Sequence, residues 1–392
     1  MSPDIFRFSE KPGPLAVGLR VVEQYDYSRE FGPHADGRSE PHVGEHVRPL
    51  QTLVWYPAEP SGVPAIKVGD YAALWATETC FAEPLVSRQA EESLAAMRRT
   101  LTAPLWAVRD APILAGRYPV VVYAPGFSAV SWENADLCEY LASHGYLVLA
   151  SPSMGTTTRE MTYDLAGINT QARDITFLIS YANALPNADM SRIAVLGFSW
   201  GGIANLFAAA RDDRIGALVA LDGSLRFSPG FVKQAGDVHP EEMNIPLLSF
   251  AQRYWSFEES DRHLSVEERG GRSVLNAWVR GDLLIVHMLG LSHAEMTSMG
   301  QRNQDVWRRI FGDNPLVKAD YDREDGITGY AWMARYTHKF LDAYLKHDEE
   351  AKAFLRRSPR ENGVPRHAMA TCFRAATEVS EGNRPGRRMQ ST

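Results

Sequence analysis

Short apolar runs separated by amphipathic segments dominate the middle of the chain. The runs have the length of strands that are buried on both faces of a sheet, and the segments between them repeat their apolar positions with a helical period. The predicted strands lie at 119–124, 146–150, 192–196, 216–221, 246–251 and 283–288, and the predicted helices at 135–143, 171–184, 203–211 and 330–347. This alternation favours an α/β protein with a mostly parallel central sheet and helices on both of its faces.

The N-terminal part of the chain has a different pattern. Two segments of alternating apolar and polar residues, 17–25 and 50–56, flank a polar stretch at 32–49 that is rich in Gly, His and Pro. This pattern favours an antiparallel pair of strands at the edge of the sheet, joined by a long connection. A further helix is predicted at 87–101 from its Ala, Leu and Met positions.

Two later segments depart from the alternating pattern. Residues 253–281 are polar with scattered aromatic residues and are too long for a simple connection, so we expect an insertion there, a candidate lid. The tail from residue 359 is rich in Arg, Gly, Pro and Ser, a composition typical of partial disorder. We therefore expect one domain over residues 1–358, with the insertion at about 253–281, and a C-terminal extension over 359–392.

Composition excludes several classes of protein. The chain has 392 residues, 41 basic and 48 acidic side chains, and 45% hydrophobic residues, which is globular composition with a net charge of -7. The acidic balance argues against nucleic acid as a partner. No apolar run reaches the roughly 20 residues of a membrane span, so we expect a soluble protein. Residues 1–10 have no apolar core of a signal peptide, which leaves the compartment open, since an exported protein loses that peptide.

Three dispersed cysteines, Cys80, Cys138 and Cys372, offer neither a disulfide framework nor a paired metal-binding motif. Three histidines at positions 34, 42 and 46 lie in a Gly- and Pro-rich stretch without the spacing of metal ligands. We therefore predict no metal and no cofactor.

The segment Gly197-Phe198-Ser199-Trp200-Gly201-Gly202 carries the clearest chemical signal. It matches G-x-S-x-G, in which glycines two residues before and two after a serine allow a sharp turn from strand to helix. An apolar strand precedes this segment and an apolar helix follows it, as such a turn requires. Ser199 could instead only cap the helix, but a cap does not require glycine at 197, 201 and 202. The pattern favours Ser199 as a nucleophile.

A serine nucleophile needs a base and an orienting acid, which follow the serine in chain order in this arrangement. The next predicted strand ends directly in Asp222, which is our candidate acid. Glu258 and Glu259, in a looser segment, are the fallback. For the base, His293 lies in a loop after the last core strand, whereas His287 lies within that strand. Catalytic side chains are more frequent in loops, so we predict His293.

An acyl-transfer site also needs two donors for the oxyanion. One is the backbone N–H of the residue after the nucleophile, here Trp200. The other comes from the loop after the first parallel strand, where Pro125 and Gly126 fix a turn that directs the N–H of Phe127. An ordinary Pro-Gly turn is the alternative. Aromatic residues expected around the mouth, many of which could also serve the core, are Phe127, Trp132, Phe198, Trp200, Phe227, Phe231, Tyr254, Trp255, Phe257 and Trp278.

The chain resembles the dienelactone-hydrolase-like branch of the α/β-hydrolases, and within it the platelet-activating-factor acetylhydrolase (group VII phospholipase A2-like) esterases. The likeness covers most of residues 12–345 and includes Trp55-Tyr56-Pro57, Tyr118 to Val122, Leu141 to Tyr146, Gly197 to Gly202 and Leu291-Ser292-His293. It implies an α/β-hydrolase fold and a metal-independent ester hydrolase for short or oxidised acyl groups. In that family the acid follows the strand after the turn, which matches Asp222. Two departures are Pro125, where the family usually has His, and the long segment 256–282.

These observations together predict a serine carboxylic-ester hydrolase with a Ser199–His293–Asp222 triad and an acyl-enzyme intermediate. The expected partner is a small-molecule ester, with a short-chain, aryl or lipid-like structure. An amidase or peptidase with the same triad is an alternative, and a non-catalytic α/β-hydrolase that serves as a binding module is another. The natural substrate and the oligomeric state stay open.

Overall fold

A computed structural model describes residues 6–32, 47–81, 88–253, 273–303 and 323–377. The strands are β1 (Ala16–Glu30), β2 (Val47–Ala58), β3 (Ala107–Arg109), β4 (Tyr118–Ala124), β5 (Leu147–Ala150), β6 (Ala188–Phe198), β7 (Ile215–Leu221), β8 (Leu247–Ala251), β9 (Leu283–Met288) and β10 (Met369–Arg374). The longer helices are α2 (Arg88–Met97), α3 (Ala135–Ser143), α4 (Leu165–Ala182), α5 (Trp200–Ala209), α11 (Arg323–Leu345) and α12 (Glu349–Arg356). The shorter ones are α1 (Val68–Ala73), η1 (Leu74–Thr77), α6 (Pro229–Ala235), α8 (Val274–Ala277), η3 (Ala294–Met296) and α9 (Ser298–Arg302).

The strands of the described ranges form one sheet in the order β10-β9-β8-β7-β6-β4-β5-β2-β1-β3. All neighbours between β9 and β5 run parallel. β2 runs antiparallel to β5, and β1 runs antiparallel to β2. The predicted sheet, mostly parallel with an antiparallel N-terminal pair, is confirmed. The short strand β3 pairs parallel with β1 and lies outside that pair.

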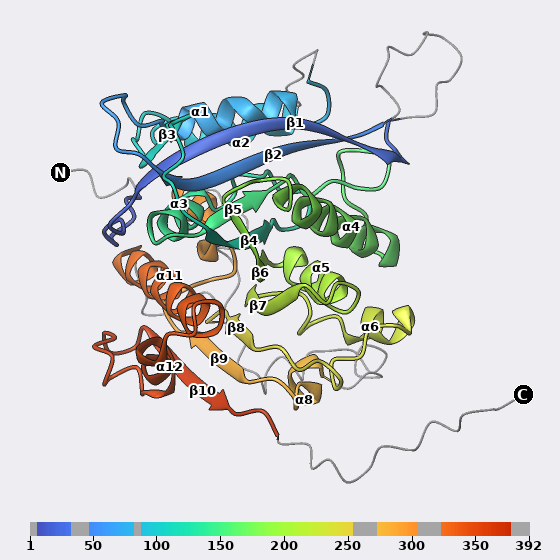
Figure 1. The fold of residues 1–392 in the computed structure, drawn as a ribbon, viewed down its shortest axis with the longest axis vertical. Helices are drawn as coiled ribbons and strands as arrows, with labels where there is room; N and C mark the ends of the chain where they lie inside the picture. Colours follow the sequence, from blue (N-terminus) through green and yellow to red (C-terminus); the bar gives the residue numbers. More distant parts are fainter. Residues whose placement is uncertain (1–5, 33–46, 82–87, 254–272, 304–322, 378–392) are drawn as a thin grey trace, which may run out of the picture.

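Helices cover both faces of the sheet (Figure 1), as the apolar strands predict. α3 and α11 contribute to one hydrophobic core together with one face of the strands, and α4 and α5 contribute to a second core on the other face. The central strands β4, β5 and β7 are almost entirely buried, because each faces a helical layer on both sides. α5 is buried on nearly all its sides because it packs on β4, β6 and β7 and also against α4.

The structure extends the sheet beyond the expected end of the domain at residue 358. β10 lies within the expected C-terminal extension and pairs antiparallel with β9 from Met369 to Arg374. The sequence reading missed it because only alternate residues of this edge strand are even partly buried, so no apolar run marks it. α4 begins at Leu165, six residues before the predicted start at residue 171. Its N-cap is Asp164, whose side chain accepts the Gly167 N–H, a signal that the sequence does contain.

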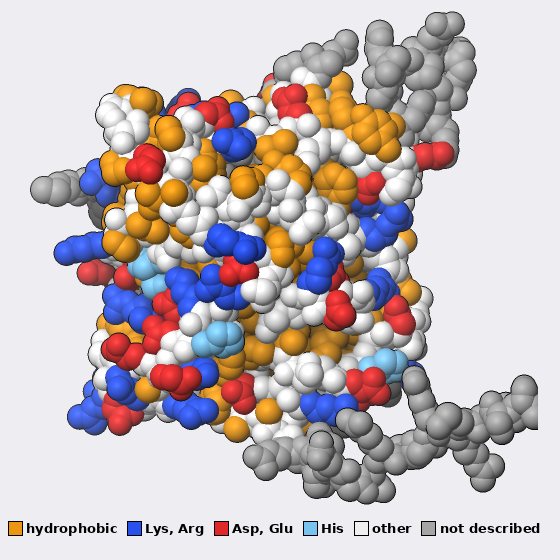
Figure 2. All heavy atoms as spheres, viewed as in Figure 1, with side chains coloured by type: hydrophobic (Ala, Val, Ile, Leu, Met, Phe, Trp, Pro, Cys, Tyr) orange, Lys and Arg blue, Asp and Glu red, His pale blue; other side chains and the backbone are white. Residues whose placement is uncertain are grey.

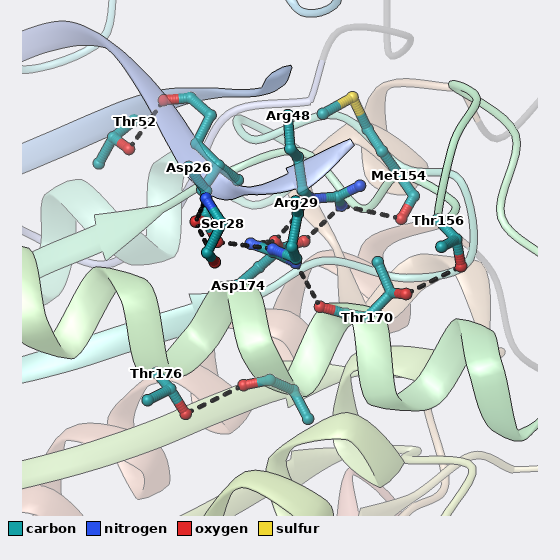
Figure 3. Close-up of polar contacts among 12 residues, drawn as sticks. Asp26, Ser28, Arg29, Arg48, Thr52, Met154, Thr156, Thr170, Asp174 and Thr176 are labelled. Atoms are coloured by element: carbon teal, nitrogen blue, oxygen red, sulfur yellow. Dashed lines mark hydrogen bonds and ion pairs between the residues drawn. The ribbon is translucent and has the colours of Figure 1, made fainter. Parts of the chain in front are cut away.

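A buried ion-pair cluster ties the N-terminal strands to α4 (Figure 3). Asp174 of α4 pairs with Arg29 of β1 at 2.6 Å and with Arg48 of β2 at 2.6 Å. Arg48 also donates to the carbonyl oxygens of Met154 and Gly155 at 3.1 and 2.6 Å. Two guanidinium groups therefore share one carboxylate, and the spare donors fix the segment after β5. α4 is thereby anchored to both β2 and this segment.

On the face drawn in Figure 2, Lys and Arg side chains are interspersed with Asp and Glu. Such mixing of charges is typical of a solvated surface. In the part of the chain that the structure describes, no helix combines the length and the apolar character needed to cross a bilayer.

His144, at the C-terminus of α3, lies beside a second histidine. Its ring centroid is 4.0 Å from that of His338 on α11, and His338 Nε2 is 2.9 Å from Asp342. The His144 Nδ1 atom lies 2.8 Å from the carbonyl oxygen of Tyr140. Burial, and then the charge of His338, lower the pKa of His144 to about 4.

Acid is therefore expected to destabilise the protein through His144. The unfolded imidazole takes up a proton near pH 6.5, whereas the folded one stays neutral until its pKa of about 4. Because the unfolded state binds more protons in this window, the free energy of unfolding falls as pH falls through it. With an allowance for partial exposure, His144 accounts for about 1 kcal/mol of that loss.

His144→Asn keeps an N–H near the position of Nδ1 but has no titrating group. Between about pH 7 and pH 5, thermal unfolding followed by circular dichroism should show a smaller drop in Tm for this variant than for the wild type. His239→Asn, at a half-exposed histidine, serves as the control. Its Tm should drop over this pH range as much as that of the wild type. An equal drop in all three proteins would contradict the assignment.

Candidate active site

The candidate residues gather at the carboxyl ends of neighbouring parallel strands. Ser199 follows β6 directly, Asp222 follows β7 directly, and His293 lies in the loop after β9. β6, β7, β8 and β9 are consecutive in the sheet. Because parallel strands end at the same edge of a sheet, residues far apart in the sequence meet there.

Ser199 lies at the sharp turn between β6 and α5. Its backbone has φ 51° and ψ -116°, a conformation that is rare outside glycine. A Cβ at Gly197 would collide with the backbone of Gly201, and a Cβ at Gly201 would collide with the carbonyl oxygen of Ala124 on β4. The two glycines therefore permit the turn, and the serine itself carries the backbone strain. Ser199 stays partly exposed.

Three side chains form one hydrogen-bonded chain. His293 Nε2 lies 3.0 Å from Ser199 Oγ, and His293 Nδ1 lies 2.6 Å from Asp222 Oδ2. The Asp222 side chain is fully buried, whereas that of His293 is 41% exposed. With Nδ1–H donated to the carboxylate, the Nε2 lone pair faces the serine hydroxyl, so this imidazole can accept the hydroxyl proton.

Local hydrogen bonds shape the loop that carries His293. The N–H and the Oγ of Ser292 both donate to Glu295 Oε2, at 2.8 and 2.6 Å. Further on, the N–H of Ser298 donates to Asn134 Oδ1 at 3.0 Å. The loop is thus closed on itself and attached to the segment before α3.

The predicted oxyanion loop follows β4, the neighbour of β6. Phe127 lies in this loop and Trp200 begins α5. Their rings are 5.5 Å apart in an edge-to-face contact. Between described residues, the backbone N–H of neither residue takes part in a hydrogen bond to another backbone group. An oxyanion donor must lack such a backbone partner, so both N–H groups stay candidates for that role.

Three comparisons relate the chain to known proteins. The chlorophyllase family matches over residues 87–225. An uncharacterized protein of Pseudomonas aeruginosa, PA2218, is 28% identical over 150 residues, which are 37% of this chain and 39% of the relative. The chain thus matches well under half of that relative's length. Among solved structures, a ferulic acid esterase from Streptomyces cinnamoneus superposes with a TM-score of 0.61 at 19% identity, covering 93% of this chain and 98% of the esterase.

The chain has the α/β-hydrolase fold. In this fold the turn between the nucleophile strand and the following helix presents a serine at the top of the sheet, which is where Ser199 lies. The comparisons do not separate the dienelactone-hydrolase-like branch from other α/β-hydrolases.

Three aromatic rings gather around Trp200, the residue after Ser199. Phe127, Tyr163, Trp200 and Phe231 are here called the aromatic cluster. The Tyr163 ring lies 5.1 Å from Trp200 and 5.4 Å from Phe231. Phe127 is 44% exposed and Tyr163 is 65% exposed. Exposed aromatic rings that adjoin one another form an apolar surface suited to a ligand.

The other aromatic residues expected at the mouth lie outside the aromatic cluster. Trp132 and Trp278 are buried, and Trp278 Nε1 donates to the carbonyl oxygen of Ile245 at 3.1 Å. Phe198 packs its ring against the imidazole of His293, with centroids 4.7 Å apart. Outside the described residues lie Tyr254, Trp255 and Phe257, with most of the predicted lid.

The alternatives for the base and the acid are placed as follows. His287 lies inside β9, opposite Ala251 of β8 and Ala370 of β10, and His293 is the histidine bonded to Ser199. Glu258 and Glu259 lie outside the described residues. Within the described ranges, no three His, Cys, Asp or Glu side chains gather in a way that could bind a metal ion.

Glu133 is a buried carboxylate beside the oxyanion loop. Its Oε2 atom accepts the N–H of Gly126 and the hydroxyl of Tyr123, each at 2.9 Å. Burial raises the pKa of Glu133 to about 7, and these two bonds and the charge of His293 oppose the rise.

Sequence reasoning missed three residues around the site: Tyr163, Glu133 and Gln171. Gln171 of α4 is buried and donates its Nε2–H to the carbonyl oxygen of Pro125 at 2.8 Å. None of the three lies in a motif, and each reaches the site only through tertiary packing. The sequence does not show that Glu133 is buried, so it gives no reason to place this acid beside the Pro125–Gly126 turn.

Proposed function

We propose that this α/β-hydrolase is a serine carboxylic-ester hydrolase that acts through an acyl-enzyme. The observation that carries the proposal is the hydrogen-bonded chain from Asp222 through His293 to Ser199. A serine hydroxyl becomes an effective nucleophile when a base with a fixed tautomer removes its proton. The strained turn at Ser199 supports the same role.

In the first half of the reaction, Ser199 Oγ attacks the ester carbonyl carbon while His293 Nε2 takes the hydroxyl proton. The backbone N–H groups of Phe127 and Trp200 bind the negative oxygen of the tetrahedral intermediate. His293 then gives its proton to the leaving alcohol, and the acyl group stays on Ser199. Asp222 keeps the imidazole oriented and stabilises the imidazolium.

In the second half, water takes the place of the alcohol. His293 removes a proton from the water as the water oxygen attacks the acyl carbonyl carbon. His293 then gives that proton to Ser199 Oγ as the acyl–oxygen bond breaks. The acid leaves and the free enzyme is restored. All groups in this scheme belong to the protein, the ester and water.

The substrate class that we propose is an ester with a short apolar, aryl or lipid-like acyl group. The exposed rings of Phe127 and Tyr163 support it, since they offer an apolar surface against Trp200, the residue after Ser199. The structural neighbour named a ferulic acid esterase and the resemblance to the dienelactone-hydrolase-like branch agree with it.

The proposal is tested by labelling the wild-type protein with a fluorophosphonate probe and by assaying p-nitrophenyl acetate hydrolysis. We expect the probe to abolish turnover and to be found by mass spectrometry on the peptide that contains Ser199. A matched ester and amide pair measures the preference for esters over amides. Turnover that survives complete labelling, or a label on another residue, would refute the proposal.

Removing the ring of Tyr163, the more exposed of the two exposed rings in the aromatic cluster, is expected to weaken aryl-ester binding. Tyr163→Ala should raise KM for an aryl ester such as methyl ferulate about 5-fold, since an aromatic contact contributes roughly 0.5–1.5 kcal/mol. KM for p-nitrophenyl acetate, whose acyl group is a single methyl, should change less. Steady-state kinetics on the two esters measures the difference.

The control is Tyr27→Ala, because Tyr27 is also an exposed tyrosine, at 83%, but lies on β1. It should leave both KM values unchanged. Equal changes for the two esters in Tyr163→Ala would mean that the cluster does not select the acyl group.

A further inference from the structure

Two buried side chains hold opposite sides of one peptide group in the oxyanion loop. Gln171 Nε2 donates to the carbonyl oxygen of Pro125 at 2.8 Å. Glu133 Oε2 accepts the N–H of Gly126 at 2.9 Å. The C=O of Pro125 and the N–H of Gly126 belong to the same planar peptide unit. One contact comes from α4 and the other from the segment before α3, and these helices lie on opposite faces of the sheet.

Once this peptide plane is held, only φ and ψ of Gly126 separate it from the next peptide group, so holding it narrows the directions open to the next N–H. A planar unit can rotate only about its two flanking bonds, and a hydrogen bond at each side prevents that rotation. The next N–H along the chain is that of Phe127, the expected oxyanion donor. An oxyanion donor stabilises the transition state only when it already points to the place where charge develops.

We propose that Glu133 and Gln171 are positioning residues that clamp the Pro125–Gly126 peptide and so aim the Phe127 N–H at the oxyanion. This inference rests on the proposed ester hydrolysis. The residues touch no reacting atom in this scheme and act through the backbone of the loop. They are here called the peptide clamp.

The burial of the clamp residues supports a specific role. Glu133 and Gln171 are both buried, at 7% and 2% exposure, and polar groups are costly to bury. The Oε1 atom of Gln171 has no hydrogen-bond partner among the described residues. The side-chain contact of this buried amide is therefore the one that Nε2 donates to Pro125. The hydroxyl of Tyr123 also donates to Glu133 Oε2 and holds the carboxylate in place.

The backbone of Glu133 connects the clamp to the loop of the base. Its carbonyl oxygen accepts the N–H of Met299 at 3.0 Å, and Met299 lies in α9, which follows the His293 loop. The oxyanion loop and the loop of the proposed base are therefore attached to one residue. A change at position 133 that preserves this backbone bond isolates the effect of the side chain.

Glu139 of α3 is a matched control inside the same chain. It is also a buried glutamate, and burial also raises its pKa to about 7. Its carboxylate likewise accepts a tyrosine hydroxyl, that of Tyr71 at 2.7 Å, and backbone N–H groups, those of Trp106 and Ala107 at 2.6 and 3.1 Å. It holds a segment that is not part of the oxyanion loop.

The test compares the kinetics of four variants with the wild type. Glu133→Ala and Gln171→Met, each of which removes one side of the clamp, should lower kcat about 10- to 100-fold, with KM for p-nitrophenyl acetate nearly unchanged. Glu133→Gln keeps an oxygen that can accept the Gly126 N–H, so it should restore most of kcat. Glu139→Ala should lower Tm as much as Glu133→Ala does but leave kcat unchanged.

Hydrogen exchange of the peptide that covers residues 124–130 gives a readout that does not depend on turnover. Exchange should be faster in Glu133→Ala and Gln171→Met than in the wild type, and unchanged in Glu139→Ala. The clamp is overturned if Glu139→Ala loses as much activity as Glu133→Ala, if Glu133→Gln is as impaired as Glu133→Ala, or if exchange stays unchanged. A wild type without Ser199-dependent turnover would refute the ester hydrolase instead, and exchange would still decide whether the clamp holds the loop.

Discussion

Ser199→Ala is expected to reduce kcat for ester hydrolysis about a million-fold, as in other enzymes where the nucleophile of such a triad is removed. Without Oγ no acyl-enzyme forms, and water must attack the bound ester directly. A residual rate above that in free water should remain, because the proposed oxyanion donors, the N–H groups of Phe127 and Trp200, are unchanged. KM should change little, since the hydroxyl contributes little to ground-state binding.

The fold should survive this substitution. The methyl group of alanine occupies the place of the serine Cβ, and the turn depends on Gly197 and Gly201 rather than on the hydroxyl. Circular dichroism and Tm of Ser199→Ala check this point. Ser224→Ala is the control, because the backbone N–H of Ser224 donates to the Ser199 carbonyl oxygen at 2.7 Å and an alanine keeps that bond. Full turnover in Ser199→Ala, or its loss in Ser224→Ala, would contradict the nucleophile assignment.

The parts of the fold that the sequence predicts are those set by local patterning. Apolar runs such as β4 and β7 are buried on both faces, so their composition alone marks them as core strands. β10 alternates and lies at an edge, so its pairing with β9 is not visible in composition. The apolar period predicts a start of α4 at residue 171, whereas the helix begins at Leu165, after the N-cap Asp164.

In the candidate site too, local sequence predicts some residues, and others depend on tertiary packing. Ser199, Asp222 and His293 come from strand ends that a parallel sheet brings to one edge, so an order of strands suffices to propose them together. Gln171 reaches the Pro125–Gly126 peptide from α4, and Glu133 reaches it from the segment before α3, on the opposite face of the sheet. Nothing local distinguishes them from other polar residues in α4 or near the start of α3, since their contacts depend on how each helix packs against the sheet.

Asp222→Asn is expected to lower kcat about ten-thousand-fold near neutral pH, with the fold intact. Asp222 Oδ1 accepts the backbone N–H of Gln252 at 3.2 Å, and Oδ2 lies 2.6 Å from His293 Nδ1. In the asparagine, the N–H of Gln252 selects the orientation in which the amide oxygen faces it. The amide NH2 must then face Nδ1 and donate to it. The imidazole is forced to carry its proton on Nε2, so it cannot accept one from Ser199.

The loss in Asp222→Asn should therefore appear in kcat rather than in KM or Tm, and steady-state kinetics with thermal unfolding separates these effects. Glu258→Gln and Glu259→Gln are the controls, because those carboxylates are the alternative acids of the sequence. Both should keep nearly full activity. A small loss in Asp222→Asn together with a large loss in either glutamine variant would move the acid to the segment after β8. The hydrogen bond between Asp222 and His293 would then only hold the histidine loop in place.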